Sequence, residues 1–209
     1  SIKMVLNMLM LNLPVEKIGG EMYELLTMAN RTTEDVFSLL DNLLKWTKSQ
    51  IGNLNVVYQD VDAVEVVDSV IDVFNMVAGL KKITIREEKP EKLPVCTDID
   101  MLKTIIRNLL SNAIKFSNEN SEVLVKMEEQ GDTMVVSVKD SGCGIDEEGQ
   151  QKLLHTDTHF STFGTNNEEG SGLGLLLCQD FAVKSGGKLW FTSKKGEGST
   201  FYFSIPLKK

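Results

Sequence analysis

Three short stretches carry the groups needed to hold a nucleoside triphosphate and its metal: Asn108–Phe116, Asp140–Gly144 and Gly170–Gly174. An amide oxygen is a hard ligand that suits Mg²⁺, and a lysine ammonium attracts phosphate oxygens. Glycine-rich loops let successive backbone N–H groups approach an anion closely. Together the three stretches predict an ATP–magnesium site.

The first stretch lies in a helix predicted from Asp98 to Phe116, in which Asn108, Asn112 and Lys115 share one face. Asn112 would give an oxygen to Mg²⁺, Lys115 a charge to the phosphates, and Phe116 a flat apolar surface beside the base. Taken singly, each of these residues is also ordinary on a packed surface helix. The prediction therefore depends on their combination with the other two stretches.

The second stretch follows an alternating segment, Met134–Lys139, that is typical of a strand ending at Asp140. Aspartate at such a junction is often a turn former. A carboxylate also accepts a hydrogen bond from the adenine amino group and would repel the guanine carbonyl oxygen. Asp140 therefore predicts a preference for ATP over GTP.

The third stretch is a glycine-rich approach to an apolar helix, predicted over Leu173–Lys184. Backbone N–H groups and the helix dipole at such a point favour phosphate. The spacing matches neither the Walker A loop nor the dinucleotide fingerprint. A flexible loop before a core helix remains the alternative for this stretch alone.

The order of these motifs, with Phe160–Phe163 between the second and third and Gly196–Phe201 after them, resembles the catalytic and ATP-binding domain of sensor histidine kinases in the GHKL ATPase superfamily. The resemblance covers essentially the whole chain. It implies that Asn112 coordinates Mg²⁺, that Asp140 holds the adenine amino group and that Asn108 lines the pocket. The other positions that it places at the nucleotide are Lys115, Phe116, Gly142, Gly144, Gly170, Gly172, Leu173, Gly174 and Thr200.

The resemblance implies a protein-histidine kinase that transfers the γ-phosphoryl group of ATP to a histidine, for relay to a response-regulator aspartate. The only histidines, His155 and His159, fall in a polar segment, His155–Glu169, predicted to be a lid. In the family that the chain resembles, the phospho-accepting histidine lies on the first hairpin helix. The resemblance therefore implies that this histidine falls upstream of Ser1, with no catalytic residue within this chain and no autophosphorylation. Because Ser1 already lies in an apolar helical pattern, we expect a longer protein.

Two other functions compete with this interpretation. One is a GHKL ATPase that hydrolyses ATP to drive a clamp, but such enzymes use a carboxylate base in the Asn-bearing helix. This helix has no Asp or Glu between Asp100 and Lys115. The other is a non-catalytic module in which the nucleotide is a structural ligand and the N-terminal helices form a dimer.

Residues 1–52 are predicted to form an antiparallel helical hairpin, with the break at Asn12–Pro14. The apolar positions of its second helix form a wide stripe, which favours a four-helix bundle in a homodimer. They are Met22, Leu25, Leu26, Ala29, Val36, Leu39, Leu40, Leu43, Leu44 and Trp46.

Residues 53–209 are predicted to form an α/β sandwich of the GHKL type, so the fold class is α+β, with helices on one face of a mostly antiparallel mixed sheet. Beyond the elements above, we expect one further helix, Asp62–Leu80. The remaining predicted strands are Asn55–Gln59, Ile83–Glu87, Glu122–Glu129, Lys188–Ser193 and Thr200–Pro206.

Composition narrows the class of partner. The net charge of −8 argues against binding to nucleic acid or to an anionic membrane. No stretch is long and apolar enough to span a bilayer. We therefore expect a cytoplasmic location, with any membrane anchor outside this chain. The cysteines Cys96, Cys143 and Cys178 are too widely spaced for a zinc site or disulfide framework. Cys143 is expected to be a buried, inert thiol.

Overall fold

The computed structural model describes residues 56–153, 164–165 and 172–208, together with scattered positions between 20 and 47. The chain divides into two units, Ser1–Lys48 and Ser49–Lys209. In the first unit the backbone is helical at every described position, from Gly20 to Thr47. The predicted first helix of the hairpin and the Asn12–Pro14 corner lie outside the described residues.

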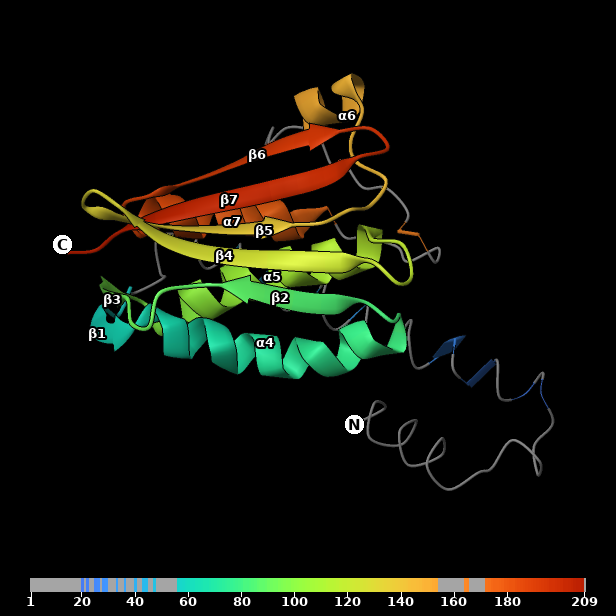
Figure 1. Ribbon diagram of the computed structural model, residues 1–209, viewed down its shortest axis with the longest axis horizontal. Coiled ribbons are helices and arrows are strands. Elements are labelled where there is room, and N and C mark those ends of the chain that lie inside the picture. The colour runs from blue at the N-terminus through green and yellow to red at the C-terminus, as the bar shows by residue number, and fades with distance from the viewer. Residues whose placement is uncertain are drawn as a thin grey trace. The chain divides into compact units, whose positions relative to one another are not determined.

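The second unit combines helices and strands along the chain (Figure 1). They are β1 (Gln59–Asp62), α4 (Ala63–Leu80), β2 (Thr84–Glu88), β3 (Pro94–Thr97), α5 (Ile99–Phe116), β4 (Glu122–Gln130), β5 (Thr133–Lys139), α6 (Glu147–Lys152), α7 (Leu173–Lys184), β6 (Lys188–Lys194) and β7 (Gly198–Pro206).

Five of the strands form one sheet in the order β2-β4-β5-β7-β6. The β2–β4 pair is parallel and the other three pairs are antiparallel. β1 and β3 form a separate antiparallel pair. The predicted mixed, mostly antiparallel sheet is confirmed.

The core lies between the sheet and the helices. Along β4 the side chains of Val123, Val125 and Met127 are buried, whereas the alternating side chains are partly exposed. This alternation is what a sheet with one covered face produces. The covering helices bury Leu102, Ile105 and Leu109 of α5 and Leu177 and Phe181 of α7, which confirms the α+β sandwich.

The two long helices begin where their sequences supply an N-cap. Asp62 Oδ1 accepts a hydrogen bond from Val64 N at 3.0 Å, and Asp98 Oδ1 accepts from Asp100 N and Met101 N at 3.0 and 3.1 Å. A side-chain oxygen at this position satisfies backbone donors that have no partner inside the helix. Both helices therefore begin within one residue of the predicted positions.

Three short elements differ from the prediction. β1 begins at Gln59, so the strand predicted over Asn55–Gln59 is wrong in position. Neither β3 nor α6 was predicted. The register of β1 is set by its partner, with Gln59 opposite Thr97, and such a contact between distant segments leaves no periodic signal in a four-residue strand. Within the described part of the chain, none of the helices combines the length and the apolar character that a membrane span needs.

Candidate nucleotide site

The Asn-bearing helix α5 presents all four of its predicted site residues at partly exposed positions. The Asn108 side chain is held by its own helix, because Nδ2 donates to Thr104 O at 2.9 Å. Lys115 Nζ lies over the Phe116 ring, 5.0 Å from its centroid. Asn112 lies between them, one turn from Asn108 and one turn from Phe116. The helix therefore offers an amide pair, a cation and an aromatic face from neighbouring turns.

Asp140 comes directly after β5 and is buried, with 4% of its surface exposed. Its Oδ1 accepts hydrogen bonds from Gly142 N at 2.9 Å and Ser199 N at 3.2 Å. Burial raises the pKa of the carboxyl, and these two backbone hydrogen bonds oppose the rise. Because both bonds are to Oδ1, Oδ2 retains acceptor capacity for a donor such as an exocyclic amino group.

The loop after Asp140 packs against the end of α5. Cys143 N donates to Phe116 O at 3.3 Å. A Cβ on Gly142 would lie 2.0 Å from the same carbonyl oxygen, so only glycine lets the two backbones approach this closely. Gly144 follows in the loop, and its neighbour Cys143 accepts through its carbonyl oxygen from Gly196 N at 2.7 Å. Asp140 and Phe116, 24 positions apart in the chain, are thus held beside each other.

The glycine-rich stretch is described from Gly172 onward, and Gly170 lies outside the described residues. Gly172 caps α7 in the left-handed conformation, with φ 69°, and supplies no side-chain cap. Leu173 is buried, and a Cβ on Gly174 would lie 2.6 Å from Asn108 Oδ1. The N-terminus of α7 therefore lies against the Asn108 side chain of α5, and the positive end of a helix dipole at this point favours an anion.

Thr200 lies on β7 and pairs with Lys139 of β5, the residue before Asp140. Its neighbour Ser199 forms two hydrogen bonds with Asp140: Ser199 N donates to the side-chain Oδ1 at 3.2 Å, and Asp140 N donates to Ser199 O at 2.9 Å. Gly198, with φ +97°, completes the contact, because a Cβ there would lie 2.2 Å from Asp140 O. Sequence reasoning missed Ser199 and Gly198. The Gly196-Glu197-Gly198 turn was the available signal for Gly198, whereas no signal in the sequence singled out Ser199.

One expectation is wrong: Cys143 is exposed. Its backbone N–H and carbonyl bond to Phe116 and Gly196, so the loop is held through the backbone of Cys143 and does not require its side chain to be buried. Phe160–Phe163, His155, His159 and most of the predicted lid lie outside the described residues.

The arrangement fits a nucleotide with a divalent metal. A buried carboxylate, a helix N-terminus without a side-chain cap and two amide side chains come from separate segments that contact one another. The described residues contain no cluster of three or more His, Cys, Asp or Glu side chains that would bind a metal by themselves. A metal at Asn112 would therefore need phosphate oxygens and water to complete its coordination, as Mg²⁺ bound to a nucleotide does.

Comparison with known proteins agrees with this chemistry. Residues 97–209 match the family described as histidine kinase-, DNA gyrase B-, and HSP90-like ATPase. The adaptive-response sensory kinase SasA of Rippkaea orientalis is 30% identical over 171 residues, which cover 81% of this chain. The chain spans only 43% of the length of that relative.

Solved structures show the same fold. The catalytic domain of histidine kinase ThkA superposes with a TM-score of 0.64 at 29% identity, covering 73% of this chain and 97% of that domain. The structure of ThkA in complex with the response regulator TrrA superposes with a TM-score of 0.70 at 23% identity, covering 99% of this chain and 57% of that one. The chain therefore belongs to the histidine kinase-, DNA gyrase B- and HSP90-like ATPase family, and its ATP-binding domain is a histidine kinase catalytic domain of the two-component kind.

Proposed function

We propose that this domain binds Mg-ATP where α5, the Asp140 loop and the N-terminus of α7 meet, and that it donates the γ-phosphoryl group to a histidine. The observation that carries the proposal is the buried Asp140, fixed through Oδ1 by two backbone N–H groups. A carboxylate held in this way keeps one oxygen in a fixed direction, which suits recognition of the adenine amino group.

The other roles follow from position and chemistry. Asn112 would ligate Mg²⁺ through its amide oxygen, and Lys115 would contact the phosphates. Phe116 would lie beside the base, near Thr200, while Asn108 would line the pocket where α5 meets α7. The glycines from 170 to 174 would turn backbone N–H groups toward the phosphates.

Phosphoryl transfer to a histidine needs an imidazole nucleophile, which residues 1–52 do not supply. In a phosphoryl transfer to histidine, an imidazole nitrogen bonds to the γ-phosphorus while the bond to the bridging oxygen breaks and ADP leaves. Residues 1–52 contain no histidine. We therefore assign the acceptor to a histidine outside these residues, and the domain's own contribution is to position the nucleotide and neutralise its charge.

Two partners belong to the proposal. The first is a second copy of the chain, joined through the helices of residues 1–52 into a four-helix bundle. Among the described positions of this segment, large apolar side chains are exposed in the single chain at Met22, Leu25, Met28, Val36, Leu40, Leu43 and Leu44. Exposed apolar side chains in such number favour a helical partner. The second is a response-regulator receiver domain, suggested by the ThkA–TrrA complex.

The test measures ATP turnover and radiolabel transfer with and without a separately purified hairpin that carries the histidine. Label on the added hairpin, lost on Asn112→Ala, would support the kinase. Steady hydrolysis without the hairpin would indicate a clamp-type ATPase. Binding with neither transfer nor hydrolysis would indicate a module in which the nucleotide is structural.

A further inference from the structure

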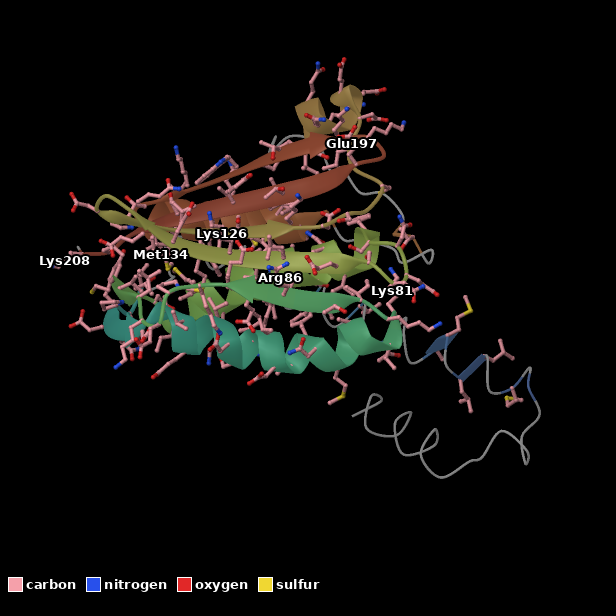
Figure 2. The ribbon with its side chains drawn as sticks, viewed as in Figure 1. Lys81, Arg86, Lys126, Met134, Glu197 and Lys208 are labelled. Carbon is pink, nitrogen blue, oxygen red and sulfur yellow. The ribbon has the colours of Figure 1, made fainter. Side chains whose placement is uncertain are left out.

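Lys81 is a buried lysine that lies outside the predicted nucleotide site. It caps the C-terminal end of α4, where the chain turns toward β2 (Figure 2), and only 7% of its surface is exposed. The next residue, Lys82, is exposed and has a positive φ of 55°. Lysine is rarely buried unless its ammonium group has partners. The buried ammonium group of Lys81 therefore needs polar partners within the fold, whereas the exposed side chain of Lys82 does not.

The ammonium group of Lys81 donates to three oxygen atoms. Nζ lies 3.0 Å from Ile114 O, 2.9 Å from Lys115 O and 2.7 Å from Thr165 Oγ1. Thr165 in turn donates from its backbone N to Lys115 O at 3.1 Å and from Oγ1 to Ser117 O at 2.8 Å. The hydrogen bonds of the Lys81 ammonium group thus connect the end of α4 to the end of α5 and to Thr165.

The carbonyl groups that Lys81 holds belong to the last turn of α5. The final carbonyls of a helix have no partner within it, and a cation beside them is favoured by the helix dipole. Lys81 satisfies Ile114 O and shares Lys115 O with Thr165, while Cys143 N satisfies Phe116 O. The turn held in this way is the one that carries Lys115 and Phe116.

We propose that Lys81 is a positioning residue of the nucleotide site: its ammonium group fixes the last turn of α5 and so aims Lys115 at the phosphates. The inference rests on the proposed function, because it assigns to Lys115 a contact with the nucleotide. Lys81 itself acts through the backbone of α5 and through Thr165 and is not assigned a contact with the nucleotide. Without the ammonium group, Ile114 O loses its donor, and the turn is free to shift.

The first test compares Lys81→Met with Lys82→Met, which removes the same charge from the neighbouring exposed position. We expect Lys81→Met to weaken binding of a fluorescent ATP analogue with Mg²⁺ by about tenfold, the size expected for loss of a charge-assisted hydrogen bond. Lys82→Met should bind as the unmodified chain does. Equal affinities for the two variants would overturn the inference.

A double-mutant cycle separates positioning from general destabilisation. If Lys81 acts through Lys115, then Lys81→Met should cost much less affinity in a Lys115→Met background than alone, because interacting residues are not additive. Equal costs in the two backgrounds would overturn the role. Failure of the unmodified chain to bind the nucleotide would instead overturn the proposed function.

Thr165 offers a second route should Lys81→Met fail to fold, because Thr165 is exposed and its loss should leave the core intact. Thr165→Val removes the hydroxyl that accepts from Lys81, and Thr165→Ser retains it. We expect Thr165→Val to weaken nucleotide binding by about threefold, less than Lys81→Met because the ammonium group keeps its two carbonyl partners, and Thr165→Ser to restore it. Identical binding by the Val and Ser variants would contradict the network.

Discussion

Gly174 in the first turn of α7 packs against the carboxamide of Asn108 on α5, so closely that a Cβ at position 174 would lie 2.6 Å from Asn108 Oδ1. The helix N-terminus proposed to face the phosphates is therefore in direct contact with the amide proposed to line the pocket. The contacting atom is at the end of a side chain that can rotate. A methyl group at position 174 would displace the Asn108 carboxamide more readily than it would disrupt the fold.

Gly174→Ala should therefore weaken Mg-ATP binding by about tenfold while changing the free energy of unfolding by less than about 1 kcal/mol. The matched control is Gly79→Ala in α4, where an added Cβ would meet nothing within 4 Å. That variant should gain roughly 0.5–1 kcal/mol in stability, because alanine is the better helix former, with no change in binding. Calorimetric titration and denaturant unfolding measure both quantities. Unchanged affinity in Gly174→Ala would refute the link between α7 and Asn108.

Asp140→Asn keeps the oxygen that accepts from Gly142 N and Ser199 N but turns an N–H donor toward the place assigned to the adenine amino group. Two donors facing each other should cost on the order of a hundredfold in ATP affinity. Asp132→Asn, at the exposed opposite end of β5, is the control and should bind normally. Retention of ATP affinity by Asp140→Asn would exclude the adenine contact.

The unmodified chain and Asp140→Asn also give a pH test. Burial raises the pKa of Asp140 in the folded state above its value in the unfolded chain. The stabilising contribution of the protonated group is therefore fully present below the unfolded pKa and is lost as pH rises through the folded pKa. The amide that replaces the carboxyl in Asp140→Asn does not titrate, so the unmodified chain should gain stability relative to this variant as pH falls from neutral into the carboxyl range. Thermal unfolding across that range measures the difference in stability between the two chains. If the unmodified chain instead loses stability relative to Asp140→Asn as pH falls, the backbone hydrogen bonds to the carboxylate outweigh its burial.

The helices that carry the candidate site could be predicted because the signals for them are local in sequence. The N-caps Asp62 and Asp98 set where α4 and α5 begin, and the spacing of Asn108, Asn112 and Lys115 put them on one face of α5. What could not be predicted depends on contacts between distant segments. β3 is four residues long and begins at Pro94, so only its pairing with β1 defines it.

Two supporting residues gave no usable signal for the same reason. Ser199 bonds Asp140 through its backbone N–H, a group that every residue except proline carries. Lys81 precedes a second lysine and is indistinguishable in sequence from a surface residue, although its neighbour Lys82 is exposed and Lys81 is buried. The two lysines differ in burial, and this difference depends on the position of the end of α5 in the folded chain.

Cys143 provides a probe of the site that needs no substitution. Its thiol is exposed beside the Asp140 loop, whereas Cys178 is fully buried and burial raises the pKa of its thiol, which keeps it protonated and unreactive. A thiol reagent should modify Cys143 first.

At a Mg-ATP concentration about ten times the dissociation constant, the reaction at Cys143 should slow about tenfold if the bound form excludes the reagent. Mass spectrometry of the labelled chain gives the rates. Cys96 on β3 is the internal control, and slowing at Cys96 equal to that at Cys143 would point to a general effect on the fold.

The proposed dimer predicts that a charge on the apolar stripe of residues 22–44 separates the two copies. Leu40 is helical and 47% exposed in the single chain. Leu40→Glu would bury a carboxylate in the proposed bundle and should yield a monomer by light scattering. Leu80→Glu places the same charge on α4, at a side chain that is 87% exposed, and should leave the dimer intact. A monomeric unmodified chain, or a dimer lost equally in both variants, would contradict the assignment to residues 1–52.

The central claim is that Asn112, Asp140 and the glycines before α7 grip a single nucleotide with its metal. Isothermal titration of a non-hydrolysable ATP analogue, with and without Mg²⁺, tests it most directly in the unmodified chain and in Asn112→Ala and Asp140→Asn. We predict one site per chain, a clear dependence on Mg²⁺ that Asn112→Ala abolishes, and loss of binding in Asp140→Asn while both variants remain folded. Binding that is the same in all three chains, or no binding in the unmodified chain, would contradict the account.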